Sequence, residues 1–284
     1  MDKLVRDQAE GLRRLLRRHA PRVVAIAGGT PRGGQTSVAV ELAAALAHQG
    51  RDVLLLDETG HACAALGLAS HHHLDDVLAG EMPLSMAQTR LRDGLAVLPA
   101  EAHKMTGELS AQWPALLGAT APDIVLIDAA ASPAAPLSPL ACHAQDVMVV
   151  LTPSAESITG AYAWIKRAHL THAIPRFRLL ANRAGESEAT VMCRNLAGTA
   201  SRYLAVALEL AGCVPVDRQL QQARQLHRCV VDAFPAAPAA VQFRQLATAL
   251  MQWPAATRAP LPLARNGAAG GSGSVGLAAQ PCAR

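Results

Sequence analysis

Apolar positions along the chain fall into short runs that alternate with longer alanine-rich or amphipathic stretches. Seven runs have the length of a buried parallel strand, and they cover residues 23–27, 52–57, 94–99, 123–128, 146–152, 177–182 and 208–214. Helical patterns follow at residues 35–46, 110–117, 157–169, 188–203 and 239–251. This alternation predicts an α/β fold with a single doubly wound, mostly parallel sheet and helices on both faces.

Three connecting segments have a readable pattern of their own. Residues 58–70 and 129–140 are rich in small residues and are expected to be loops. His71, His72 and His73 are adjacent, and three adjacent side chains cannot all face one metal ion. We therefore expect them to lead into an exposed helix rather than to form a metal site.

The segment that follows the first strand contains a glycine-rich turn. It matches the phosphate-loop pattern G-x-x-x-x-G-K-[ST] at Gly29, Gly34 and Thr36, but position 35 is Gln instead of Lys. Gln35 can donate a hydrogen bond but cannot neutralise charge, and Pro31 removes one backbone N–H from the loop. Two interpretations stay open: a phosphate loop that has lost charge, or a tight turn that never meets phosphate.

Polar residues stand at the carboxyl ends of several predicted strands, where ligands bind in sheets of this kind. They are Thr30, Asp57, Asp128, Asn182 and Asp217, and the topology predicts that they share one rim of the sheet. An acid at the position of Asp128 holds Mg²⁺ in phosphate-loop proteins, and the Thr36 hydroxyl is a second candidate ligand.

The two ends of the chain differ from the middle. Residues 3–19 are basic and place Val5, Ala9, Leu12 and Leu16 on one helical face. Such a helix suits a partner protein, its own domain or an anionic membrane surface. Residues 254–284 are rich in Pro, Ala, Gly and Ser and are expected to be disordered. The expected organisation is a helix at 1–21, one domain at 22–253 and a tail at 254–284.

Composition narrows the class of protein. The chain has 284 residues, a net charge of +4 and six scattered cysteines without a C-x-x-C pair. The charge is too mild to indicate nucleic acid, and the cysteine pattern favours a reducing cytosol over a disulfide framework. Neither a secretory signal nor a membrane-spanning apolar run is found in the sequence.

Taken in chain order, the motifs resemble those of the MinD/ParA-type deviant P-loop ATPases, and within them the flagellar number regulators FlhG (also called FleN). Two segments make the resemblance specific. Residues 152–166 read TPSAESITGAYAWIK, and residues 7–13 match a D-Q-A-x-x-L-R element that lies outside the ATPase core. The resemblance covers roughly residues 5–250 and leaves the tail out.

The resemblance implies a site for ATP or ADP with Mg²⁺. The corresponding positions are Gly29, Gly33, Gly34, Gln35, Thr36, Ser37, Asp57, Asp128, Asn182, Arg183, Pro215 and Asp217. Thr36 and Asp128 would hold the Mg²⁺ ion, and Asp128 is the one acid left that could take part in catalysis.

The resemblance also implies partners. The N-terminal element would stimulate an FlhF-type flagellar GTPase of the signal-recognition type through Asp7, Gln8, Ala9, Leu12 and Arg13. Flagellar switch proteins, a flagellar transcription activator and a second copy of the chain are further implied partners. The implied location is the cytoplasm, with indirect or weak recruitment to the inner face of the membrane or the cell pole.

This chain departs from the family pattern at the positions that serve catalysis in the family. Thr30 and Gln35 replace two lysines, Asp57-Glu58-Thr59 replaces D-A-D, and residues 128–132 lack both glycines of D-T-G-A-G. Phosphoryl transfer depends on positioning and on charge neutralisation, so we expect nucleotide to bind weakly or not at all, and hydrolysis to be weak or lost.

Three functions remain open on the sequence alone. The first is an adaptor that stimulates the GTPase through Gln8 on a degenerate ATPase scaffold. The second is a working ATP-dependent dimerisation switch of the MinD type. The third is a ParA-type positioning protein whose N-terminal arginines contact DNA, although nucleic acid is the less favoured partner.

Overall fold

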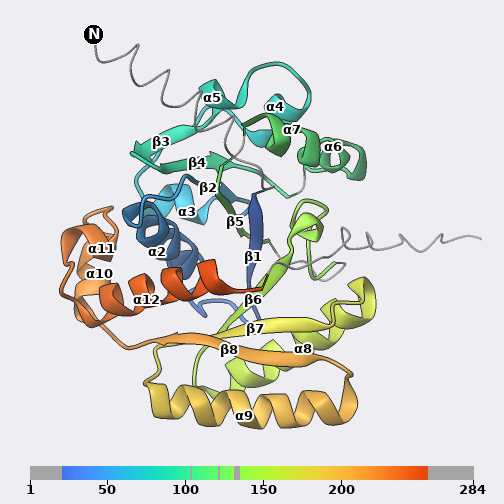
Figure 1. Cartoon of the computed structure of the whole chain (residues 1–284), viewed down its shortest axis with the longest axis vertical. Helices are drawn as coiled ribbons and strands as arrows, with labels where there is room; N and C mark the ends of the chain where they lie inside the picture. The colour runs from blue at the N-terminus through green and yellow to red at the C-terminus, as the bar shows by residue number, and fades with distance from the viewer. Residues whose placement is uncertain (1–20, 103, 121, 131–134, 255–284) are drawn as a thin grey trace, which may run out of the picture.

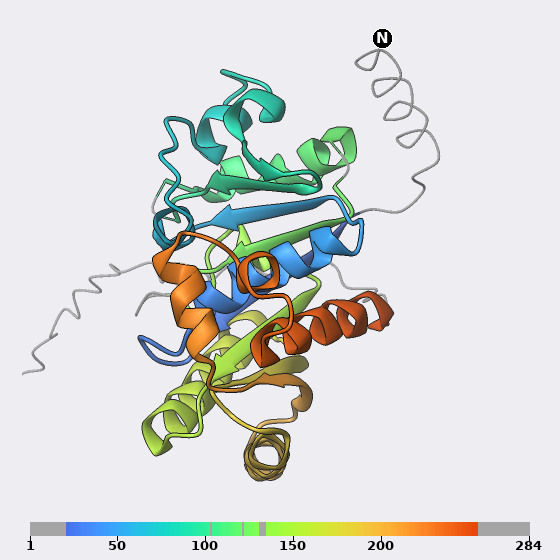
Figure 2. The ribbon, with the colours of Figure 1, turned by 90° about the vertical axis from the view of Figure 1, so that its left-hand side faces the viewer.

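The computed structural model of the chain describes residues 21–102, 104–120, 122–130 and 135–254. Eight strands form one sheet in the order β3-β4-β2-β5-β1-β6-β7-β8, with helices on both faces (Figures 1 and 2). This arrangement confirms the predicted doubly wound sheet. The expected N-terminal helix and tail lie outside the described residues.

Seven of the strands run parallel, and β3 alone pairs antiparallel with β4. The strands are β1 (Arg22–Gly28), β2 (Val53–Asp57), β3 (Thr89–Arg92), β4 (Leu95–Pro99), β5 (Ile124–Asp128), β6 (Asp146–Leu151), β7 (Arg176–Asn182) and β8 (Ala207–Val214). The helices are α2 (Gln35–His48), α3 (His61–Ala65), α4 (Leu74–Leu78), α5 (Leu84–Ala87), α6 (Gly107–Ala111), α7 (Trp113–Thr120), α8 (Ala155–His172), α9 (Glu186–Tyr203), α10 (Arg218–Gln225), α11 (Val230–Ala233) and α12 (Pro238–Gln252), with a 3₁₀ turn η1 (Ala141–His143).

The central strands are apolar throughout because both of their faces are covered. In β1, Val23 and Ala25 join the core on one face of the sheet, whereas Val24 and Ile26 join the core on the other. Helices α8 and α9 cover the first face, and α2 and α12 cover the second (Figures 1 and 2). A parallel strand buried on both sides needs a continuous apolar run rather than an alternating one.

Several local expectations were wrong. Residues 58–70 contain the short helix α3, and the helix expected at 110–117 is divided into α6 and α7. Strand β3 and helices α10 and α11 were not expected. Strand β3 reads Thr-Arg-Leu-Arg and α10 is strongly polar, so neither shows the apolar pattern on which the predictions rested. His73 precedes α4, as expected for a helix start.

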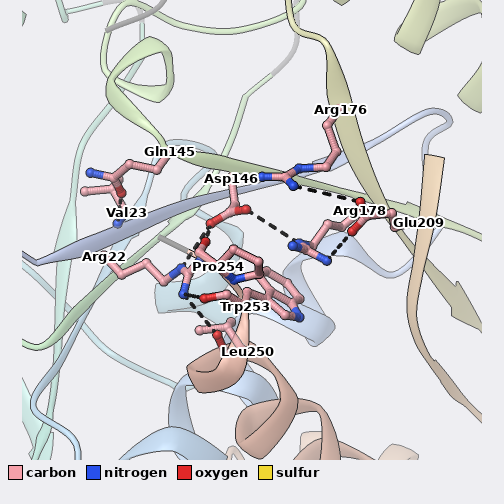
Figure 3. A network of polar contacts seen from close by, with 10 residues as sticks. All are labelled: Arg22, Val23, Gln145, Asp146, Arg176, Arg178, Glu209, Leu250, Trp253 and Pro254. Carbon is pink, nitrogen blue, oxygen red and sulfur yellow. Dashed lines mark hydrogen bonds and ion pairs between the residues drawn. The ribbon is translucent and has the colours of Figure 1, made fainter. Parts of the chain in front are cut away.

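Polar contacts near the amino ends of the strands hold the end of α12 against the sheet (Figure 3). Arg22 donates to Asp146 and to the carbonyl oxygens of Leu250 and Trp253. The Arg178 guanidinium pairs with the second oxygen of Asp146 and lies 4.0 Å from the centroid of the Trp253 ring. This network occupies the edge of the sheet opposite the rim described next.

Candidate functional site

The glycine-rich turn between β1 and α2 is held close to two neighbouring elements. A Cβ atom on Gly29 would lie 2.4 Å from the backbone of Ala161 in α8, so the loop rests directly on that helix. Gly34 has a φ of 90° and a Cβ there would lie 2.2 Å from Nδ2 of Asn182. Both glycines are therefore required by the fold of the loop.

Asn182, the last residue of β7, supports the loop from the side. Its Nδ2 donates to the carbonyl oxygen of Gly33 at 2.8 Å, and the side chain is buried. The loop thus has a fixed shape that exposes the start of α2, a geometry that suits an anion.

Two buried acids end the neighbouring strands β2 and β5, and one of them, Asp128, contacts the loop side. Asp57 and Asp128 are paired across β2 and β5, and both are fully buried. The Thr59 hydroxyl donates to Oδ1 of Asp57 and to Oδ2 of Asp128. Burial raises the pKa of Asp128, and nearby Asp57 raises it further, while hydrogen bonds with Thr36, Gln35 and Thr59 act in the opposite direction. The predicted pair of Mg²⁺ ligands, Thr36 and Asp128, is therefore in contact.

Gln35 occupies the position of the missing lysine and points at the same acid. Its Nε2 donates to Oδ1 of Asp128 at 2.6 Å and to the carbonyl oxygen of Ala129 at 2.8 Å. Both amide hydrogens are used inside the protein. Gln35 therefore joins α2 to the end of β5 instead of presenting a donor to a ligand.

Glu58 is a third buried acid at this rim, and the sequence reasoning gave it no role. One carboxylate oxygen accepts from the backbone N–H of Ala130 at 2.8 Å, and the other accepts from the Ser138 hydroxyl. Burial raises the pKa of Glu58 to about 7, and Asp128 and Asp57 add to the shift. Its adjacency to Asp57 in the sequence was the one available signal.

The positions of both lost lysines are free of positive charge. Thr30 lies against Gly160 of α8, because a Cβ on Gly160 would approach Cγ2 of Thr30 to 2.4 Å. Arg32 is exposed in the loop with a φ of 66°. Among the described residues the lysines are Lys104 and Lys166, and neither belongs to the loop.

The rest of the predicted set lines a pocket of about 180 Å³ beside the loop. Its walls include Gly34, Ser37, Asn182, Arg183, Pro215 and Asp217. The structure therefore divides the predicted residues between two adjoining parts: an acid-rich part around Asp128, and a pocket at the ends of β7 and β8.

Two acids of this pocket accept hydrogen bonds from backbone N–H groups. Asp217 accepts from the N–H groups of Gln219 and Ala239, at the starts of α10 and α12. Glu41, which the sequence reasoning missed in the alanine-rich helix, accepts with both oxygens from the N–H of Val230. Burial raises the pKa of Glu41 to about 8 despite hydrogen bonds from Val230 and Val231, and Asp232 adds to the shift.

The two parts differ in how well they fit a nucleoside triphosphate with Mg²⁺. The pocket beside Gly34 has room for a base, and the loop keeps its shape. The part around Asp128 has no lysine from the described residues, and Gln35 is engaged with Asp128 and Ala129. It does not fit the charge of a triphosphate, so no hydrolytic step follows from this geometry.

The predicted partner-binding residues lie outside the described residues; they are Asp7, Gln8, Ala9, Leu12 and Arg13. Within the part that the structure describes, no group of three or more His, Cys, Asp and Glu side chains is placed to hold a metal ion. The described helices include none that is both long and apolar enough to span a bilayer.

Comparison with known proteins places these observations in context. No family model matches the chain. It is 33% identical over 247 residues to the antiactivator FleN of Pseudomonas aeruginosa, covering 83% of this chain and 88% of FleN.

Solved structures share the fold. A chain of the MinC:MinD cell division protein complex of Aquifex aeolicus superposes with a TM-score of 0.69 at 21% identity, over 86% of this chain and 99% of that one. MinD of Pyrococcus horikoshii, solved with Mg-ADP, gives a TM-score of 0.63 at 21% identity, over 82% and 96% of the two chains.

Proposed function

Because the chain belongs to the FleN (FlhG) family of MinD/ParA-type proteins, we propose that it regulates flagellar number and placement as an adaptor that works without an ATP cycle. The observation that carries this proposal is the contact of Gln35 with Asp128 and Ala129. The residue that replaces the catalytic lysine is committed to an internal contact and carries no charge.

The geometry around Gln35 supports a weak or absent ATPase. Removing one contact to the charge that develops in a transition state costs about 10²–10³ in rate, and two lysines are replaced here. ATP or ADP with Mg²⁺ would bind weakly or not at all, with Thr36 and Asp128 as the metal ligands. The protein would thus be a pseudo-ATPase that uses the fold as a scaffold.

The first proposed partner is an FlhF-type flagellar GTPase, contacted by Asp7, Gln8, Ala9, Leu12 and Arg13. GTPases use a glutamine side chain to orient the attacking water, so Gln8 is the residue suited to stimulate turnover. The name antiactivator, which FleN carries, supports a flagellar transcription activator as a second partner. Flagellar switch proteins and a second copy of the chain are further candidates, and the proposed location is the cytoplasm near the membrane or pole.

GTP turnover by the cognate flagellar GTPase tests this proposal. Turnover is measured for the GTPase alone, for the GTPase with the wild-type protein, and for the GTPase with the Gln8→Ala variant, all without ATP. We expect stimulation by the wild type and its loss in Gln8→Ala. Glu10→Ala is the matched control, because Glu10 occupies a variable position of the same element and should leave stimulation intact.

Two results would contradict the proposal. If stimulation appears only after ATP is added, the protein is a nucleotide-dependent switch. If stimulation is absent both with and without ATP, the sequence match at residues 7–13 does not indicate stimulation of a GTPase.

One observation favours a second candidate function. The contact between Thr36 and Asp128 is retained, and so is the pocket beside Gly34. These are the parts that an ATP-dependent dimerisation switch needs besides its lysines. An ATP-induced increase in mass would support this second function.

A further inference from the structure

Positive charge has a different distribution in this site from the one that a triphosphate requires. In the loop, Thr30 and Gln35 replace the two lysines of the family pattern, so neither position carries a positive charge. The adjoining pocket is lined by three arginines, Arg183, Arg224 and Arg228. We propose that this pocket binds a nucleoside bisphosphate, a nucleotide with a second phosphate on its ribose, and that the three arginines contact that second phosphate.

The arginines are available for a ligand. All three residues are exposed and line the pocket, and their side chains make no hydrogen bond or ion pair with the described part of the chain. A guanidinium group binds phosphate with paired, charge-assisted hydrogen bonds. Three such groups around one pocket form a site for a phosphate at the base end of the ligand.

The acids of the pocket do not cancel this charge. Both oxygens of Asp217 accept N–H groups at the starts of α10 and α12, where the helix dipoles offset its negative charge. Glu41 is buried and held by the N–H of Val230, in surroundings that favour its protonated form at neutral pH. The pocket is therefore cationic overall.

The backbone that carries two of the arginines is fixed in unusual conformations. Arg183 has a φ of 59°, and its N–H donates to the side chain of Asn182. Arg228 follows His227, whose φ is 52° and whose ring nitrogen Nδ1 contacts the carbonyl oxygen of Ala65. Left-handed backbone at non-glycine residues is held at a cost and is common at ligand sites.

The size of the pocket agrees with this assignment. About 180 Å³ holds a nucleobase, while Gly34 and Ser37 reach the pocket from the start of α2. A ligand with its 5′-phosphate at that helix end extends its base and ribose toward the arginines. A neutral base alone gives three arginines no charged partner, whereas a ribose phosphate does.

Binding of adenosine 3′,5′-bisphosphate and of AMP to the full-length protein, measured by calorimetry, tests the inference. We expect the bisphosphate to bind more tightly by about tenfold or more, because charge-assisted hydrogen bonds are the strong class. The Arg224→Gln/Arg228→Gln variant should lose most of this difference and keep its affinity for AMP. Arg194→Gln, an exposed arginine of α9 away from the pocket, is the control.

Equal affinity for the bisphosphate and AMP would overturn the inference, as would binding of neither. So would inorganic phosphate binding as tightly as the bisphosphate, or an equal loss in Arg194→Gln. The test does not involve the GTPase, so its outcome is separate from that of the proposed adaptor function.

Discussion

At the scale of single residues, Gly34 shows how the loop depends on one backbone conformation. Gly34→Ala would place a Cβ 2.2 Å from Nδ2 of Asn182 at a φ of 90°. We expect the free energy of unfolding to fall by about 1–3 kcal/mol, because a left-handed conformation is unfavourable for alanine and Asn182 must move. Urea unfolding measures this change.

Gly198→Ala is the matched control for Gly34→Ala. Gly198 lies within α9, and a Cβ there would meet nothing within 4 Å. We expect this substitution to stabilise the protein by about 0.5–1 kcal/mol, since alanine favours a helix. An equal loss of stability in both variants would show that Gly34 has no special role.

Glu41 should make stability depend on pH. Its pKa is raised from 4.5 to about 8 in the folded protein, so the folded state holds a proton that the unfolded state releases. The stabilising contribution is complete below the unfolded pKa and is lost as pH rises through about 8. Glu58 adds a similar dependence, with a pKa of about 7.

Glu41→Gln tests this dependence by urea unfolding between pH 5 and pH 8. The wild type should lose more stability over this range than Glu41→Gln, because glutamine does not titrate and can still accept from Val230. Glu188→Gln on the surface of α9 should behave as the wild type. Identical pH profiles for the wild type and Glu41→Gln would contradict the protonated state of Glu41.

At the scale of elements, the network at the end of α12 offers a comparison between two acids that bind the same arginine. Asp146 is 2% exposed and Glu209 is 42% exposed, and both contact Arg178. We expect Asp146→Ala to cost about 3–5 kcal/mol, because it leaves the buried Arg178 poorly compensated. Glu209→Ala should cost less than about 1 kcal/mol, since exposed pairs contribute little.

Thermal and urea unfolding of Asp146→Ala and Glu209→Ala decide this point. If the two substitutions cost the same, burial does not set the strength of the network. A large loss in Asp146→Ala alone would show that burial sets the strength of these contacts.

The elements that the sequence predicted well are those whose burial determines their composition. The central strands, such as 123–128, are apolar because both faces are covered, and they appeared as continuous runs. Strand β3 at the edge and the polar helix α10 were missed because they are only partly buried and lack a continuous apolar pattern. The break at Gln112 between α6 and α7 was missed although Pro114, in the first turn of α7, is a local signal for a helix start.

At the scale of the whole molecule, the sequence predicted which residues meet because parallel strands end at one rim. Asp57 and Asp128 are paired there, and Asn182 ends β7 on the same rim, where its side chain contacts Gly33. The sequence could not show that Gln35 would contact Asp128, or that Arg224 and Arg228 would line one pocket with Gly34 and Ser37. Those relations depend on side-chain directions and on the turn between α10 and α11.

The measurement that tests the central claim most directly is the mass of the full-length protein with and without MgATP, by light scattering, beside its ATP turnover. The account predicts an unchanged mass and turnover at the level of the blank, because Thr30 and Gln35 supply no charge to the phosphates. An ATP-dependent doubling of mass with measurable turnover, both lost in Thr36→Ala, would contradict the account and make the protein a working switch.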